Sequence, residues 1–206
     1  MTRLTAYRVE TERLVIRCWD PRDAPLLDAA ISSSLNHLKP WMAWAHEEPK
    51  SLEDRIDLLR SFRGKFDLGQ DYVFGILNGN ESEVVGGTGF HTRQGKHILE
   101  IGYWIRADLV RKGFATESTA ALVRIAFEIA KVPRVEIRCD PKNEPSAAIP
   151  RKLGFVNEGI LRGSGEFLGQ PRDTEVWSLI ADEYSSSPSS QSTLKAFDAV
   201  GQLLLE

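Results

Sequence analysis

The chain has 206 residues, of which 42% are hydrophobic and 27% are charged, and its formal net charge is −3. This composition suits one soluble domain with a substantial core, and the slight acidity argues against general binding of nucleic acid. No apolar run approaches the roughly 20 residues that span a bilayer and no secretory leader is evident, so we expect a cytoplasmic protein with no membrane partner.

The first third of the chain predicts one strand followed by two helices. Leu14, Ile16 and Cys18 alternate with their neighbours in "RLVIRCW", a pattern typical of a strand. Asp20 is a suitable N-cap for the next helix, and Ser51 for the one after it, because an acidic residue stands three positions further on. That second helix carries apolar residues at helical spacing: Leu52, Ile56, Leu59 and Phe62.

The middle and the end of the chain alternate between strand and helix patterns. "DYVFGILN" and "EVVGGTGFHTR" flank the turn-prone "NGNES" and predict a hairpin, and Ile98 to Arg106 predicts a third strand. A helix to about Lys131, a strand at "RVEIRCD", a short helix at "SAAIPRKLGF" and two strands around "NEGILRG" and "DTEVWSLI" follow. This order predicts an α+β (mixed α/β) fold, with a largely antiparallel central sheet of about six to seven strands and helices on both faces.

The C-terminal residues 185–206 are predicted to lie outside the main domain, which spans residues 1–184. "SSSPSSQS" is Ser-rich and has no apolar anchor, so we interpret it as a linker. The tail after it predicts an amphipathic helix, with apolar residues on one stripe: Leu194, Phe197, Val200, Leu203 and Leu204. This helix docks either on its own domain or on a second copy of the chain, which would make a homodimer.

A basic, glycine-containing turn opens the central helix, in "LVRKGFATES" (109–118). The N–H groups of a first helical turn have no partner within the helix, and the helix dipole adds partial positive charge there. Gly113 allows close approach of a ligand, Ala115 leaves the amides open, and Arg111 and Lys112 add cationic charge. The pattern favours an anion site, and the alternative is a solvated basic turn. The P-loop spacing is absent, which disfavours a nucleoside triphosphate.

The same stretch resembles a motif of the GCN5-related N-acetyltransferase (GNAT) superfamily. "ADLVRKGFATESTAALVRIAFE" is similar to its acyl-CoA motif [Q/R]-x-x-G-x-[G/A], with Gly113 and Ala115 at the fourth and sixth positions and Val110 at the first. "EIGYWI" resembles the strand before that motif, and "DPKNEPSAAIPRKLGF" resembles the later N-x-x-S and K-L-G-F segment. "ETERLVIRCWDPRDA" resembles the start of the ribosomal-protein branch (RimJ/RimL type). The resemblance covers roughly Glu10 to Ile180.

This resemblance implies a GNAT fold and an enzyme that transfers acetyl from acetyl-CoA, as co-substrate, to a primary amine by direct attack on the thioester. The acceptor it implies is a protein or peptide N-terminus. A small amine of the antibiotic or polyamine type, or a binding module without turnover, are the alternatives. No metal is expected, and Cys18 and Cys139 lack metal-ligand spacing. The implied cofactor-binding residues are Tyr103, Trp104, Ile105, Val110, Arg111, Lys112, Gly113, Phe114, Ala115, Thr116, Asn143 and Ser146.

The candidate catalytic residues are Glu100, Ser146 and Glu166. Glu100 is the first candidate base and Glu166 its rival, acting through water, while each also fits an exposed strand or hairpin glutamate. The resemblance gives Ser146 the task of protonating the departing thiolate, and its alternative task is that of a helix N-cap.

Three further side chains are candidates for the acceptor side of the site. Trp41 and Trp44 stand three apart where this fold forms its substrate walls, and His91 lies on a strand near the expected cleft. For all three, ordinary packing or structural hydrogen bonding is the alternative. A further local feature is Pro150, which has no N–H and therefore leaves the carbonyl of Ser146 without its helical donor.

Overall fold

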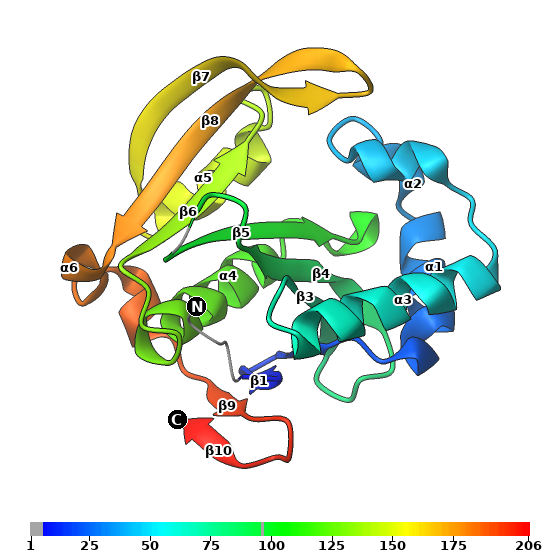
Figure 1. The fold of residues 1–206 in the computed structure, drawn as a ribbon, viewed down its shortest axis with the longest axis horizontal. Helices are drawn as coiled ribbons and strands as arrows, with labels where there is room; N and C mark the ends of the chain where they lie inside the picture. Colours follow the sequence, from blue (N-terminus) through cyan, green and yellow to red (C-terminus); the bar gives the residue numbers. More distant parts are fainter. Residues whose placement is uncertain (1–5, 96) are drawn as a thin grey trace.

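One continuous sheet runs through the part of the chain that the computed structural model describes, residues 6–95 and 97–206 (Figure 1). Its strand order is β10-β9-β1-β2-β3-β4-β5-β6-β8-β7, and all neighbouring strands among the described residues pair antiparallel except β5 and β6, which are parallel. The strands are β1 Arg8–Glu10, β2 Leu14–Cys18, β3 Tyr72–Asn78, β4 Val84–His91, β5 Ile98–Ile105, β6 Arg134–Cys139, β7 Val156–Phe167, β8 Gln170–Ile180, β9 Lys195–Phe197 and β10 Leu203–Leu205.

Helices cover both faces of this sheet, as the sequence predicts (Figure 1). The α-helices are α1 Ala24–Ser32, α2 Leu35–Leu38, α3 Leu52–Asp67, α4 Phe114–Glu128, α5 Glu144–Lys152 and α6 Ala181–Tyr184. The short 3-10 turns are η1 Pro21–Asp23, η2 Ala43–Glu47, η3 Ala107–Leu109 and η4 Pro188–Gln191. From β2 to β8 the order of the longer elements is the predicted one, and the short helix α2 is additional. Within the described ranges, no helix is long and apolar enough to cross a membrane.

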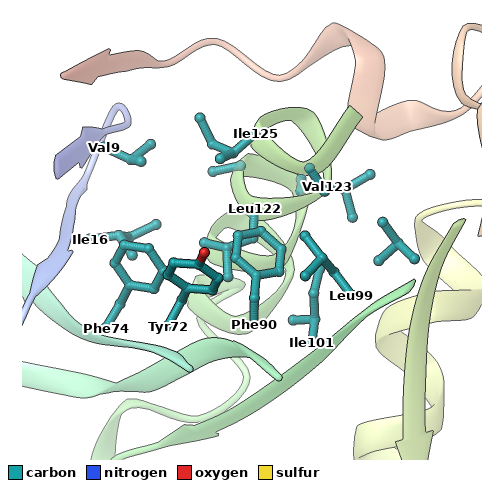
Figure 2. Close-up of a cluster of buried hydrophobic side chains, with 14 of the residues drawn as sticks. Val9, Ile16, Tyr72, Phe74, Phe90, Leu99, Ile101, Leu122, Val123 and Ile125 are labelled. Carbon is teal, nitrogen blue, oxygen red and sulfur yellow. The ribbon is translucent and has the colours of Figure 1, made fainter. Parts of the chain in front are cut away.

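The larger core lies between the sheet and α4, and Figure 2 shows its centre. Phe74 and Phe90 project from neighbouring strands toward the buried face of α4, where Leu122 and Ile125 meet them. Each such fully buried side chain contributes about 1.5–3 kcal/mol relative to exposure. A second, smaller core joins α1 and α3 to the opposite face of the sheet, around Trp19. The sheet centre is therefore held from both sides.

Local signals fix where the elements begin. Ser51 caps α3 as predicted, because its hydroxyl accepts from the N–H of Asp54 at 3.1 Å and its own N–H donates to the Asp54 carboxylate at 3.3 Å. Asp20 caps the η1 turn ahead of α1, accepting from the N–H of Arg22 at 2.9 Å. The hairpin predicted around "NGNES" joins β3 to β4.

The tail after residue 192 is a β-hairpin, and the predicted amphipathic helix is wrong. β9 pairs with β1 and β10 pairs with β9, so both extend the sheet beyond the expected six to seven strands, as does the short β1. The five apolar residues of the tail are spaced mostly three apart, which suits a helix, whereas the buried Leu194 and Ala196 are two apart, which suits a strand. The turn decides between them, because the Asp198 carboxylate accepts from the N–H groups of Val200 and Gln202 at 2.9 and 2.8 Å.

The Ser-rich segment before the tail is packed against the domain, which corrects its interpretation as a linker. It forms a turn of helix, η4, in which Ser187 and Ser189 are buried. Arg124 of α4 donates to the carbonyl of Ser192 at 2.8 Å. Serine hydroxyls bonded to nearby carbonyls let a polar segment pack without apolar side chains, and composition alone does not reveal this. Residues 1–5 of the predicted domain lie outside the described residues.

Candidate active site

β5 and β6 diverge in the middle of the sheet. Their parallel pairing covers three positions, Ile98 with Arg134, Leu99 with Val135 and Glu100 with Glu136. Beyond Glu100, β5 continues to Ile105 paired only with β4 among the described strands, while β6 turns away with β8. The backbone of β5 from 101 to 105 thus offers an edge inside the sheet, to which an extended ligand can bind as an added strand.

Alternation along β5 sends its side chains to the two faces of the sheet. Ile101 and Tyr103 pack against the core under α4, whereas Trp104 packs with the smaller core around α1 and α3. Glu100 shares the face of Trp104, as the period of a strand predicts. On the side of α4 the divergence is therefore bordered by Ile101 and Tyr103, and on the side of α1 and α3 it is bordered by Trp104.

The start of α4 is open to a ligand. Gly113 is its N-cap, with φ of +84°, and no side chain caps the first turn. A glycine adopts this left-handed backbone without strain, and the N–H groups that follow it remain available to an anion. Arg111 and Lys112 are exposed, and neither forms an ion pair with any described residue. Val110 is also exposed, so the missing Gln or Arg at this position removes no buried contact.

Arg13, in the turn between β1 and β2, braces this loop, and the sequence analysis missed it. Its guanidinium donates to the carbonyl of Lys112 at 3.0 Å, pairs with Glu117 of α4 at 2.5 Å, and lies 4.6 Å from the ring centre of Phe114. No local pattern pointed to Arg13, because its partners lie about a hundred residues away. It holds the basic loop against the first turn of α4.

Ser146 lies across the divergence from Tyr103. The Tyr103 hydroxyl donates to the carbonyl of Ser146 at 2.9 Å, and the Ser146 hydroxyl lies 3.3 Å from the hydroxyl oxygen of Tyr103. Asn143 is the N-cap of α5, with its side-chain oxygen 3.3 Å from the N–H of Ser146. Ser146 therefore does not cap the helix, and its side chain stays available to a ligand.

Glu100 is buried at the point of divergence, and its carboxylate is engaged on both oxygens. Arg93 forms an ion pair with it, and the Gln94 amide donates to it at 2.7 Å. Burial raises the pKa of Glu100, but Arg93 and Gln94 outweigh this and hold the pKa below the ordinary glutamate value. Glu100 is therefore ionised at neutral pH. Its role as the base stays a prediction.

His91 and Trp44 lie on the same face of the sheet as Glu100. Nδ1 of His91 is 2.9 Å from Asp71, and its Nε2 lies over Gly102, where a Cβ atom would come within 3.3 Å. Trp44 meets the Trp104 ring edge-on, with 6.1 Å between ring centres. Trp41 is half-buried and forms no ring contact with any described aromatic residue. The two tryptophans thus differ, since only Trp44 joins η2 to β5.

The β7–β8 hairpin contacts Pro40, just after α2, and His46, in η2, and we call these two contacts the bridge. Phe167 lies edge-on to His46 with 5.9 Å between ring centres, and Arg172 donates to the carbonyl of Pro40 at 3.3 Å. Arg172 also covers the Phe167 ring and pairs with Asp140, just after β6, at 3.0 Å. Glu166 lies next to Phe167 in this hairpin and is exposed.

A family model described as an acetyltransferase (GNAT) domain matches residues 13–156, well over half of the chain. The chain belongs to the GNAT acetyltransferase family. Within it, the Bacillus subtilis N-acetyltransferase YoaA is 30% identical over 84% of this chain and 96% of its own length. The ribosomal protein uS5-alanine N-acetyltransferase of Escherichia coli is 27% identical over 86% and 93%.

A solved structure supports the same fold for this GNAT chain. RimJ of Mycobacterium smegmatis, in complex with CoA-disulfide, superposes with a TM-score of 0.77, covers 90% of this chain and 91% of its own, and is 24% identical. At that identity the likeness shows the fold. The family match and the named relatives identify this chain as an acetyl-CoA-dependent N-acetyltransferase.

The chain itself fits a GNAT co-substrate. An anionic diphosphate suits the uncapped first turn of α4 with its two unpaired cations, and a flexible arm bearing amides suits the free edge of β5. In the described part of the chain, no three His, Cys, Asp or Glu side chains form a group that could hold a metal ion.

The GNAT site contains a second buried carboxylate that the sequence analysis missed. Glu136 faces Glu100 in register and is held by Arg134 at 2.7 Å and Arg138 at 2.9 Å. A signal was present in "RVEIRC", because charged residues at every second position of a strand share one face. Arginines pair with both carboxylates, so the last paired position of β5 and β6, Glu100 with Glu136, is held by ion pairs.

Proposed function

We propose that this GNAT enzyme transfers the acetyl group of acetyl-CoA to the free N-terminus of a protein or peptide. The observation that carries this proposal is the divergence of β5 and β6 beside the uncapped start of α4. The free edge of β5 leads directly to the anion site at the start of α4, and Ser146 lies across the divergence from Tyr103.

The residues that bind acetyl-CoA in this proposal follow the chain from strand to helix. Backbone groups of Tyr103 to Ile105 pair with the pantetheine arm, Val110 to Thr116 surround the diphosphate, and the Asn143 amide reaches the arm from the other side. When bound, acetyl-CoA supplies a thioester carbonyl that an amine can attack directly.

The chain's own groups then divide the chemical work. Glu100, through a water molecule, accepts the proton that the amine must lose before it attacks. A backbone N–H of Tyr103 to Ile105 stabilises negative charge on the carbonyl oxygen. The Ser146 hydroxyl donates a hydrogen bond to the sulfur as the C–S bond breaks and sulfur takes the electron pair. His91, Trp41 and Trp44 face the acceptor.

The bridge favours a chain terminus as the acceptor. Phe167 contacts His46 and Arg172 contacts Pro40, so the β7–β8 hairpin is joined to the α2–η2 region. In this proposal the acceptor amine enters under these two contacts. A narrow, extended N-terminus passes beneath such a span more readily than a lysine on a folded surface. The relative named as a ribosomal protein uS5-alanine N-acetyltransferase supports a protein acceptor.

The direct test measures release of CoA thiol from acetyl-CoA with matched acceptors. We expect turnover with short peptides that have a free N-terminus, and none above background with the same peptides blocked by an N-terminal acetyl group. Faster turnover of polyamines or aminoglycosides would replace the peptide acceptor by a small amine. Binding of CoA without turnover of any acceptor would overturn the enzyme proposal.

The two candidate glutamates are separated by pH–rate profiles. Because the pKa of Glu100 is held below the ordinary glutamate value, Glu100 is already ionised wherever the acceptor amine deprotonates. Glu100→Gln should therefore lower kcat without moving the acid limb of kcat/KM, whereas the exposed Glu166→Gln should leave kcat nearly unchanged. A larger loss of kcat in Glu166→Gln would assign the base to Glu166.

A further inference from the structure

A proline interrupts the hydrogen bonding of α5 at the site. Pro150 lies inside this helix and is buried, and it has no N–H to offer. In an α-helix its donor would have bonded the carbonyl four residues earlier, which is that of Ser146. A partly buried carbonyl that is left without a donor costs free energy, so a replacement donor is expected.

The replacement comes from β5, on the opposite side of the divergence. The Tyr103 hydroxyl donates to the Ser146 carbonyl at 2.9 Å. With its one proton used in this way, the phenol oxygen is left as an acceptor, and the Ser146 hydroxyl lies 3.3 Å from it. One hydroxyl thus fixes both the backbone and the side chain of Ser146.

We propose that the Tyr103 hydroxyl positions Ser146. It replaces the donor that Pro150 lacks, and it thereby holds the Ser146 hydroxyl oxygen in the divergence, where that oxygen meets the thioester sulfur. This inference rests on the proposed function, in which Ser146 bonds that sulfur. It extends the assignment of Tyr103, whose proposed contact with acetyl-CoA uses the backbone alone.

The geometry suits a hydroxyl that must change partners. At 3.3 Å the bond from Ser146 to a neutral phenol is long, and an anionic sulfur is the stronger acceptor. The serine proton can therefore turn to sulfur while its oxygen stays in place. Burial raises the pKa of Tyr103, so the phenol keeps its proton and keeps donating to the carbonyl.

A second titratable neighbour of Ser146, Cys139, is neutral as well. Cys139 ends β6, and its thiol lies 3.8 Å from the Glu175 carboxylate. Burial, with the charge of Glu175, raises the pKa of Cys139 to about 12, so the thiol stays protonated at neutral pH. Neither Tyr103 nor Cys139 therefore carries a charge that would compete with the sulfur for the serine proton.

The test is a double-mutant cycle on the full chain, with kcat and KM measured by thiol release. Ser146→Ala should lower kcat by about 100-fold and Tyr103→Phe by about tenfold, with KM for acetyl-CoA nearly unchanged. In the Ser146→Ala background, Tyr103→Phe should lower kcat no further, because it acts through Ser146. Equal losses in both backgrounds, or an unchanged kcat in Tyr103→Phe, would overturn the proposal.

Two variants separate positioning from stability. Pro150→Ala restores an N–H for the Ser146 carbonyl, so adding it to Tyr103→Phe should recover thermal stability but not kcat. Recovery of both thermal stability and kcat would show that the Tyr103 hydroxyl only supplies a hydrogen bond to the Ser146 carbonyl and does not position the side chain. Tyr184→Phe is the matched control, because Tyr184 donates its hydroxyl to Glu128 away from the divergence, and it should leave kcat unchanged.

A crystallographic readout keeps this inference separate from the proposed function. In the structure of Tyr103→Phe, the Ser146 side chain should leave the rotamer that it has in the wild type or occupy more than one. An unchanged single rotamer would contradict positioning, whether or not an acceptor is turned over. Wild-type protein that turns over no acceptor would sink the proposed function, and the rotamer would still decide the inference.

Discussion

Arg55→Met should lower the free energy of unfolding by about 3–5 kcal/mol, because it leaves a buried carboxylate without its partner. Arg55 of α3 is 1% exposed and binds both oxygens of Glu48, itself 3% exposed, at 2.8 and 2.7 Å. It also reaches Asp28 of α1 at 3.1 Å. Chemical denaturation measures the change, as a shift of the midpoint at constant m-value.

A surface ion pair on the same helix provides the matched control. Arg60 and Asp57 are 70% and 65% exposed and lie 3.1 Å apart. Arg60→Met should cost no more than about 1 kcal/mol, because water screens such a pair. If Arg55→Met cost as little as Arg60→Met, the buried network would not anchor the connection that carries Trp44.

The cost of Arg55→Met should also depend on pH. Burial raises the pKa of Glu48, but Arg55 holds it below the ordinary value of 4.5. A depressed folded pKa gives stability that is present above the unfolded pKa and lost as the pH falls through the folded one. The difference between wild type and Arg55→Met should therefore be largest near neutral pH and narrow in acid.

Gly113→Trp should weaken CoA binding by roughly 100-fold or more, because an indole here covers the amides at the start of α4. Losing two hydrogen bonds to a charged phosphate removes about 3 kcal/mol or more, which corresponds to roughly 100-fold in Kd. Isothermal titration with CoA measures the loss. Normal binding by this variant would show that the diphosphate lies elsewhere.

Backbone strain is the competing explanation, and two alanine variants isolate it. Gly113 has φ of +84° and Gly201, in the tail hairpin, +83°. Alanine at either position costs about 1–2 kcal/mol in this left-handed region. A Cβ at Gly113 has room, with its nearest neighbour, Nη2 of Arg13, at 3.4 Å. Gly201→Ala should lose the same stability as Gly113→Ala and bind CoA normally.

Much of the fold was predictable because its signals are local. The alternation in "RLVIRCW" correctly predicted β2, and Ser51 marked the start of α3 through its own neighbours. The tail was mispredicted because the three-residue spacing of its apolar side chains is typical of a helix, whereas β1, far away in the sequence, supplies a strand partner. The turn at Asp198 and the pairing with β1 together produce the hairpin, and sequence periodicity contains neither.

The candidate site was predictable as a set of positions but not as a set of partners. The glycine at the start of α4 and Ser146 in α5 are in the sequence pattern, yet nothing local shows that Arg93 engages Glu100. The sequence pattern also does not show that the Tyr103 hydroxyl donates to the Ser146 carbonyl, although the missing N–H of Pro150 can be seen in the sequence. The partner of a polar group depends on which strands become neighbours, and that follows from the topology.

The pairing of β9 with β1 also fixes when the sheet can be completed. β1 is synthesised long before its partner β9, because the paired residues Val9 and Ala196 are far apart in the sequence. Contacts this distant in sequence form late and slowly, since the intervening chain must first be ordered. During synthesis the outer side of β1 stays exposed, and a nascent chain in that state presents an open edge to its neighbours.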